Sequence, residues 1–261
     1  MDIFSVLIEV SIIVVFVGFW KFQFLPGNCF FPRRRELALY CVLTALCAVG
    51  VLLVLLRWSA ADVQNESDEV IFYLVFSLLG IIAAQYLFGF LGISLRDDAI
   101  EKRNRSALCA TAGLTIGVSC CIAGSNVGNG PGGEVVFFCA ALSVGTLLGL
   151  WIVLATIADV AEAITVERDL GAGVRAGASL ASGGAILGAA VVGDWVSFSS
   201  TIRDFVHFAW PVFAGLVVVT AFERRINRRA IAMRLSTSES VALAAALLLA
   251  AVTYAVWVAR Q

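Results

Sequence analysis

The stretch Glu101–Glu134, EKRNRSALCATAGLTIGVSCCIAGSNVGNGPGGE, decides the fold. A basic run leads into an apolar segment that is stepped with small residues, and this segment ends in a glycine-rich loop. Its apolar part, Ser106–Ala123, is about as long as the roughly 18 residues that a helix needs to cross a bilayer. We interpret the stretch as the turn and second helix of a membrane hairpin, with the charged turn on one side of the membrane.

The composition of the whole chain is that of a membrane protein. Of its 261 residues, 61% are hydrophobic and 14% are charged, whereas soluble domains are nearer ~25% charged. The net charge is −1 and the arginines are confined to short loops, which argues against nucleic acid as a partner. These properties exclude an ordinary soluble domain and make the lipid bilayer the first expected partner.

Eight apolar blocks are long enough to span the membrane. Each is expected to be a helix, because lipid offers no partner for unpaired backbone groups. The predicted fold class is therefore all-α: a polytopic membrane helix bundle that forms one transmembrane domain over residues 1–261. No positive region precedes the first block and no small-residue cleavage site follows it, so we expect a retained helix and not a removed signal peptide. The blocks are Ile3–Trp20, Leu37–Leu56, Val70–Leu95, Ser106–Ala123, Val135–Ala158, Ala176–Gly193, Phe205–Phe222 and Ser240–Ala259.

The basic residues predict the orientation. The turns after the first, third, fifth and seventh blocks hold 15 of the 18 lysines and arginines, which leaves only Arg57, Arg203 and Arg260 for the other side. Cytoplasmic loops carry such an excess of basic residues. We therefore expect four basic cytoplasmic turns and both termini outward, which is periplasmic in a Gram-negative cell.

Each pair of blocks with its basic turn forms one hairpin, and four hairpins tile the chain. Their approximate bounds are 3–57, 70–124, 134–193 and 203–259. A shift of 71 residues lays Gly113 on Gly184 and Gly117 on Gly188. Because every hairpin starts on the same side, the pattern predicts tandem parallel repeats about an axis along the membrane normal.

Pairs of glycines four residues apart indicate helix packing. In a membrane, small residues at this spacing let two helix backbones approach closely. We expect such pairs to line contacts within the bundle or between the protomers of a homo-oligomer. The pairs are Gly113 with Gly117, Gly145 with Gly149, Gly173 with Gly177, and Gly184 with Gly188.

One part of the chain resembles a known family. From Val166 to Arg225 a charged turn leads into ERDLGAGVRAGASLASGGAILGAAVVGDW and then, after a connection, into FVHFAWPVFAGLVVVTAFERR. This is similar to the YjfL-like bacterial membrane family (domain of unknown function 350), whose tandem hairpins place a charged turn before a small-residue helix. The likeness extends over about Val70–Arg229, and Arg175 stands where the family pattern has the asparagine that Asn104 supplies. The resemblance implies the fold, the topology and the bacterial inner (plasma) membrane, and it implies no activity.

Polar side chains inside the apolar blocks are the first candidate functional residues. An ionisable group costs ~2.5–3.5 kcal/mol at a helix centre on insertion scales. Glu9 lies about two turns into the first block and is either a proton or cation site or a group that reaches the interface or a neighbouring helix. Gln85 is expected to bond across a helix contact. Asp204 and His207, near the outer end of the seventh block, form either an interfacial hydrogen bond or a titrating pair.

The loop that holds Asn126 and Asn129 and leads to Glu134 is the other candidate. Its glycines admit positive φ, and successive backbone N–H groups can bind an anion. It lacks the lysine and the strand-to-helix context of a phosphate loop. The loop is expected to be a tight outer turn between two helices, with a binding or re-entrant role as the alternative.

No catalytic set is visible in the sequence. There is one histidine and no paired cysteine or histidine spacing, so no metal or cofactor site is predicted. The sequence favours a non-enzymatic inner-membrane component that oligomerises or binds another membrane or cytoplasmic protein. The alternative is a channel or secondary transporter for a small solute or ion, and a third possibility is an intramembrane enzyme that acts on lipid.

Overall fold

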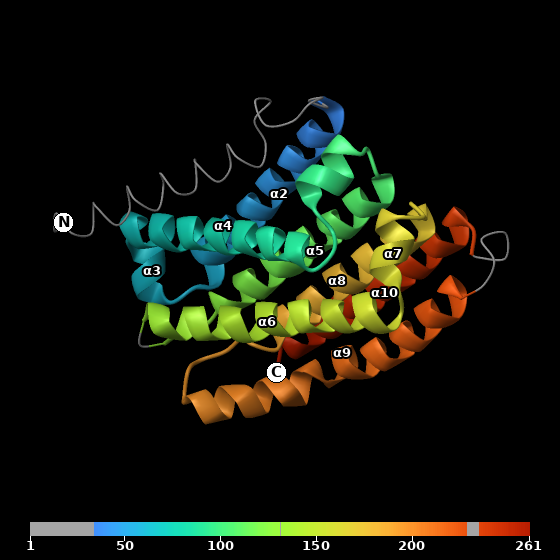
Figure 1. Cartoon of the computed structure of the whole chain (residues 1–261). Coiled ribbons are helices and arrows are strands. Elements are labelled where there is room, and N and C mark those ends of the chain that lie inside the picture. Colours follow the sequence, from blue (N-terminus) through green and yellow to red (C-terminus); the bar gives the residue numbers. More distant parts are fainter. Residues whose placement is uncertain (1–33, 131, 229–234) are drawn as a thin grey trace.

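The computed structural model describes residues 34–130, 132–228 and 235–261. Every named element in these ranges is a helix (Figure 1). The elements are α2 (Arg34–Trp58), α3 (Ala61–Asn65), α4 (Ser67–Phe90), the π-helix η2 (Leu95–Glu101), α5 (Arg105–Ser125), α6 (Gly133–Ile157), α7 (Val160–Thr165), α8 (Leu170–Ala189), α9 (Phe198–Asn227) and α10 (Thr237–Val258).

Within the described part of the chain, six helices are long and apolar enough to cross a membrane: α2, α4, α5, α6, α9 and α10. They are compatible with a multi-pass integral membrane protein. The expected block Ile3–Trp20 lies outside the described residues. The expected block Ala176–Gly193 falls mostly on α8, which is not one of the six, because its many glycine, alanine and serine residues and Arg175 lower its hydropathy.

Expected and observed helix boundaries differ most for α4, α8 and α9. Helix α8 begins at Leu170 and α9 begins at Phe198, earlier than the expected starts at Ala176 and Phe205. The third block was expected to run to Leu95, but α4 ends at Phe90 and the chain turns at Gly92, which has φ +107°. The following residues form the short η2, in which Asp98 accepts hydrogen bonds from the Ser94 backbone N–H at 2.8 Å and from Lys102 at 2.9 Å. The hydrogen bond to Asp98 raises the pKa of Lys102.

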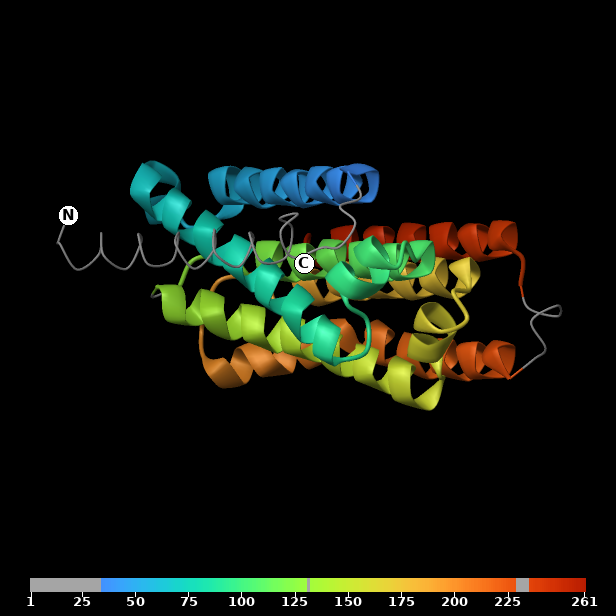
Figure 2. The same cartoon turned by 45° about the horizontal axis from the view of Figure 1, so that its top comes forward.

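The long helices pack in two rows. One row consists of α2, α5, α8 and α10 in that order, and α4, α6 and α9 pack against it. Figure 2 shows α2 and α10 on one side of the molecule and α6 and α9 on the opposite side. The core lies around α5 and α8. In the most apolar 18-residue stretch of α5, 67% of the residues are buried, whereas the share is 17% in α2 and in α10. Most residues of α8 are buried as well.

The bundle has two ends, which carry different loops. The glycine-loop end holds Ser59, Gly128 and Asp194, and the C-terminus lies there as well. The basic-turn end holds η2 and α7, together with Arg168 and Arg224. Each long helix runs from one end to the other, and successive long helices alternate in direction.

The two central helices begin in the same way. Arg103 and Arg168, each one residue before a cap, have left-handed backbones with φ 54° and 56°. Asn104 then caps α5 by accepting from two backbone N–H groups of the first turn, at 3.0 and 3.3 Å. Asp169 caps α8 with the same pattern, at 2.8 and 3.3 Å. Such caps satisfy N–H groups that a helix start otherwise leaves unpaired.

The offset between these matching turns differs from the sequence overlay. Asn104 and Asp169 are 65 positions apart, and the same offset relates Gly128 (φ +112°) to Gly193 (φ +137°). The overlay used 71 residues, six more than the backbone features require. Glycine and alanine recur every few residues in both helices, so several shifts superpose small residues on small residues.

Glycines make the contact between α5 and α8. A Cβ on Gly113 would overlap the carbonyl of Gly177, and a Cβ on Gly184 would overlap the backbone of Gly117. Further glycines meet backbone in the same interface, among them Gly124 against Gly188, Gly173 against Ser106 and Gly177 against Cys109. In contrast, an added Cβ on Gly145 or Gly149 of α6 meets nothing within 4 Å, so these two do not line a helix contact in the described chain.

Candidate functional site

The loops at the glycine-loop end are joined by backbone hydrogen bonds. The N–H of Gly128 donates to the carbonyl of Trp58 at 3.4 Å, and the N–H of Gly193 donates to the carbonyl of Val127 at 3.3 Å. The N–H of Trp195 donates to the carbonyl of Asn129 at 2.8 Å. The segments after α2, α5 and α8 therefore form one connected surface.

Gly128 is required where two of these loops meet. Its φ of +112° is a conformation that side chains with a Cβ rarely adopt, and a Cβ there would overlap the carbonyl of Gly193. The glycine-rich sequence is explained by this close approach. The loop is a tight turn between α5 and α6, as its composition indicates.

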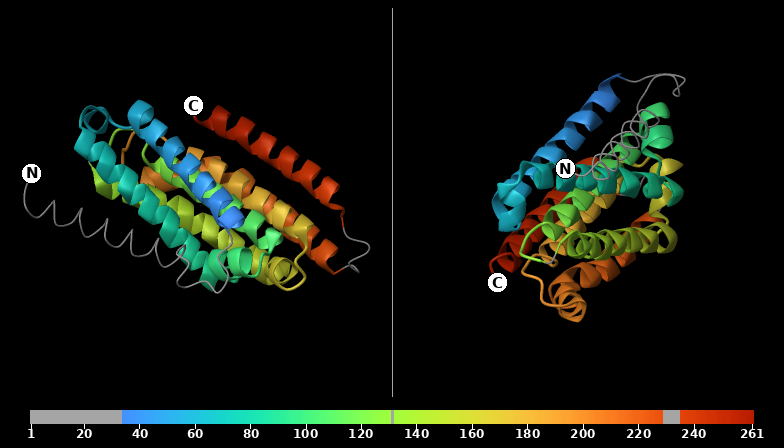
Figure 3. Two further views of the ribbon diagram at one scale, coloured as in Figure 1. Left: turned by 90° about the horizontal axis from the view of Figure 1, so that it is seen from above. Right: turned by 90° about the vertical axis from the view of Figure 1, so that its left-hand side faces the viewer.

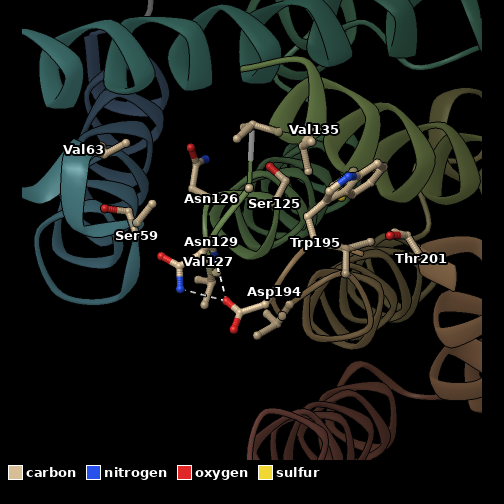
Figure 4. A pocket seen from close by; sticks show the side chains of 18 of the residues that line it. Ser59, Val63, Ser125, Asn126, Val127, Asn129, Val135, Asp194, Trp195 and Thr201 are labelled. Atoms are coloured by element: carbon tan, nitrogen blue, oxygen red, sulfur yellow. Dashed lines mark hydrogen bonds between the residues drawn. The ribbon is translucent and has the colours of Figure 1, made fainter. Parts of the chain in front are cut away.

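A pocket of about 130 Å³ lies among these loops (Figure 4). Asn129 donates to Asp194 Oδ1 twice, from its backbone N–H at 2.8 Å and from its side-chain amide at 3.0 Å. The polar residues that line the pocket come from the connections after α2, α5 and α8 and from helices α3, α4, α5 and α9. They are Ser59, Asp62, Tyr73, Ser125, Asn126, Asn129, Asp194, Thr201 and Asp204.

The electrostatics of this pocket do not favour an anion. Its wall carries three carboxylates and no lysine or arginine among the described residues, and the backbone N–H groups of Gly128 and Asn129 are used within the protein. The buried Asn126 donates its side-chain amide to the carbonyl of Ile122 at 2.7 Å and caps the C-terminus of α5. The pocket suits a cation or a neutral hydrogen-bond donor better than the anion that a glycine loop can hold.

The other candidate residues at this end are scattered. Asp204 lines the pocket, whereas His207 is exposed and its ring meets Phe208 edge-on at 5.0 Å between centroids. The structure records no hydrogen bond or ion pair between Asp204 and His207. Glu134 is exposed in the first turn of α6. Glu9 lies outside the described residues.

A buried polar cluster ties α2, α4 and α5 together. Gln85 is 5% exposed and donates to Thr115 Oγ1 at 3.1 Å. Tyr40, from α2, forms a hydrogen bond with the same hydroxyl oxygen, and Thr115 itself donates to the carbonyl of Thr111 at 2.9 Å. Hydrogen bonds of this kind hold membrane helices together at about 0.6–2 kcal/mol each.

A buried ion pair links α8, α9 and α10, and sequence reasoning missed it. Arg175 donates to both oxygens of Glu223, at 2.6 and 2.9 Å, and to Ser240 Oγ at 2.7 Å. Arg175 is 1% exposed and Glu223 is 3% exposed. Gly171 makes room for the group, since a Cβ there would lie 2.7 Å from Ser240 Oγ.

The sequence assigns Arg175 to a solvated basic turn. This is wrong, because the side chain is buried within α8. The guanidinium is enclosed by three helices because α8 begins at Leu170, so position 175 is already in its second turn. One signal could have found it: this arginine is the only charged residue within the helix and stands among small residues. Its partner Glu223 lies in the last two turns of α9, beside Arg224 and Arg225, and carries no comparable signal.

A groove of small side chains lies on the face of α5 and α8 that is flanked by α2 and α10. The ribbons of α2 and α10 are seen from above in Figure 3, left. It measures about 280 Å³. Its floor is built from Cys120 and Ala123 on α5 and from Ala185 and Ala189 on α8, and α10 contributes Ala255. Both flanking helices bury little of their surface within the chain.

Comparison with known proteins gives no relative: no protein-family model, curated protein or solved structure matches the chain. Among the residues that the structure describes, no group of three histidine, cysteine or acidic side chains is placed to hold a metal ion.

Proposed function

We propose that this protein is a non-enzymatic, multi-pass membrane component whose groove between α2 and α10 binds a transmembrane helix of another subunit. The observation that carries the proposal is the half-buried floor of small residues on α5 and α8. In lipid, helix association depends on close packing and not on hydrophobic burial, so small residues are the surface that a second helix needs.

The shape of the groove supports a helix as its occupant. Its lining runs along two central helices over more than one turn, from Cys120 to Gly124 on α5 and from Ala185 to Ala189 on α8. It continues to Val127 and Val192 in the loops that follow. Its walls are apolar, with no lysine, arginine or carboxylate in the lining. A transmembrane helix with its own small-residue face matches this surface, whether it comes from a second copy of the chain or from a different protein.

The test is to fill the groove. Ala189→Leu is expected to dissociate the assembly, measured as the mass of the particle after gentle extraction from its native membrane. Ala214→Leu on α9 is a matched control, because that alanine is exposed and does not line the groove. A wild-type particle with the mass of one chain, or an assembly that survives Ala189→Leu, would refute the proposal.

The topology and family are part of the proposal. We place the chain in the bacterial inner membrane, in the YjfL-like family that its sequence resembles, with the basic-turn end in the cytoplasm. The constant offset between the turns before α5 and α8 supports tandem hairpin repeats. A phosphatase fused to the C-terminus is then active in the periplasm, and activity only of a cytoplasmic reporter would reverse the orientation.

A channel or secondary transporter is the second candidate, and the cluster of Tyr40, Gln85 and Thr115 favours it. These polar side chains lie buried among apolar helices, where transport pathways place such groups. The Gln85→Leu variant in liposomes separates the two functions. Loss of a measured cation flux with an unchanged particle mass supports transport, whereas no flux in the wild-type protein leaves assembly as the function.

A further inference from the structure

A second cavity, of about 380 Å³, lies between α6, α8, α9 and α10. It is separate from the glycine-loop pocket and from the small-residue groove, with which it shares no polar lining residue. Leu150 of α6 and Ile186 of α8 form part of its buried floor. Gly215 of α9 and Ala250 of α10 also line it and are partly or fully exposed, so the cavity opens between α9 and α10.

Polar contacts hold the helices around this cavity at both ends. Toward the basic turns, Arg175 binds Glu223 of α9 and Ser240 of α10 at once. Toward the other end, Tyr254 of α10 donates its hydroxyl to the carbonyl of Phe208 on α9 at 3.0 Å. The helices that surround the cavity are therefore held in place by hydrogen bonds on both sides of it.

The wall is mostly hydrocarbon, and three side chains bring a hydroxyl group to it: Ser179, Ser182 and Tyr254. Ser182 is 7% exposed and lines the cavity, and its hydroxyl has no hydrogen-bond partner in the described structure. The other two hydroxyl groups in the lining are satisfied, since Ser179 donates to the carbonyl of Arg175 at 2.9 Å and Tyr254 binds Phe208.

Ser182 also differs from most other buried serine and threonine residues in the hydrogen bonding of its hydroxyl group. Most buried hydroxyl groups in the long helices donate to a carbonyl one turn earlier, as Ser77 does to Tyr73 at 2.6 Å and Ser143 does to Cys139 at 2.8 Å. Ser182 makes no such bond. Thr220 of α9, which does not line the cavity, shares the exception with Ser182. A buried hydroxyl without a partner is unfavourable, so a ligand that accepts its hydrogen bond would be favoured.

We propose that this cavity binds a neutral, lipid-soluble molecule with a hydrocarbon body and one carbonyl or hydroxyl oxygen that accepts a hydrogen bond from Ser182. The ligand is neutral because the one ion pair near the cavity is complete and a charge in hydrocarbon is costly. It arrives from the bilayer, because the opening lies between two helices with lipid-facing surfaces. This site goes beyond the proposed assembly role and does not depend on it.

The test uses two photoactivatable probes: a C16 chain with a diazirine and a mid-chain ketone, and the same chain without the ketone. After illumination in native membranes, mass spectrometry identifies the labelled peptides. The ketone probe is expected to label the segments of α8 and α9 around Ser182 and Gly215 several-fold more than other lipid-facing helices. The ketone-free probe is expected to label them less.

Matched variants decide the result. Gly215→Leu projects into open space and fills the cavity, so it is expected to remove the preferred labelling. Gly145→Leu also projects into open space but lies outside the cavity, and it is expected to leave the labelling unchanged. Ser182→Ala should abolish the preference for the ketone, whereas Ser143→Ala, at a buried serine with a satisfied hydroxyl, should preserve it.

Three outcomes would overturn the proposal. Labelling spread evenly over the lipid-facing helices would show only partition into the bilayer. Labelling that survives Gly215→Leu would place the probe elsewhere. Equal labelling by the two probes in the wild-type protein would show that Ser182 recognises no oxygen.

Discussion

Arg175 and Glu223 form a two-point ion pair between α8 and α9, with both N···O distances below 3 Å and both side chains removed from solvent and lipid. Ser240 completes the guanidinium's surroundings from α10. The desolvation of two charges offsets much of their attraction, so the pair is expected to specify how three helices meet more than to add stability.

Removing one partner of this pair should be far worse than removing both. Glu223→Gln leaves a buried guanidinium uncompensated, and we expect a loss of about 3–5 kcal/mol, measured as the free energy of unfolding in detergent. The double variant Arg175→Met with Glu223→Leu should recover most of that loss. A single variant as stable as the wild type would mean that the guanidinium is solvated and not enclosed.

The glycines of the α5–α8 contact should not tolerate even a methyl group. Gly113→Ala is expected to lower the unfolding temperature in detergent by several degrees, because its Cβ would overlap the carbonyl of Gly177. Gly149→Ala, with open space around its Cβ, serves as the control and should change it little. The larger substitutions Gly117→Leu and Gly188→Leu should prevent the native packing. Equal effects of Gly113→Ala and Gly149→Ala would contradict the close contact.

The two helix caps should differ in their contributions. Asp169→Ala removes a cap and is expected to cost about 1 kcal/mol of unfolding free energy. Asn104→Ala should cost more, because Asn104 also donates its amide to the carbonyl of Ile164 at 2.6 Å. Asn104→Asp keeps the cap but places a carboxylate oxygen against the carbonyl of Ile164, so it should also be less stable than the wild type. A ranking with Asp169→Ala as the most damaging change would speak against this assignment.

The bond between Asn129 and Asp194 should set the mobility of the glycine-loop end. Asp194→Ala removes the acceptor of two hydrogen bonds, so the backbone N–H of Asn129 should exchange its hydrogen faster. Exchange measured by mass spectrometry should rise in the segment after α5 and stay constant in the turn that holds Asp98. Asp62→Ala, at a pocket carboxylate that does not bind Asn129, is the control.

The helices were predictable because their signals are local. Long apolar blocks such as Leu37–Leu56 and Val135–Ala158 predict α2 and α6 from composition alone. The spacing of Gly113 and Gly117 predicts a close contact between helices, although it does not specify the partner helix. Asn126 and Asn129 stand out through the loop composition, and the structure brings both to one pocket.

What the sequence did not reveal depends on pairs of distant residues. Glu223 reads as part of a charged helix end until Arg175, 48 positions earlier, is placed beside it. The unpartnered hydroxyl of Ser182 resembles any other helical serine until its neighbours are known. Gly145 and Gly149 repeat the packing spacing of Gly113 and Gly117, yet they face open space, since spacing does not say which side of a helix is covered.

The backbone contact between α5 and α8 has a mechanical consequence. Because backbone meets backbone at Gly113, Gly177 and Gly184, few side chains can rearrange in this contact. The two helices should therefore behave as one rigid unit. The peripheral helices α2 and α10 have the smallest buried share of the six long apolar helices, 17% of the 18 most apolar residues of each. Any large shape change of the bundle should therefore consist of outer helices swinging about a stationary centre.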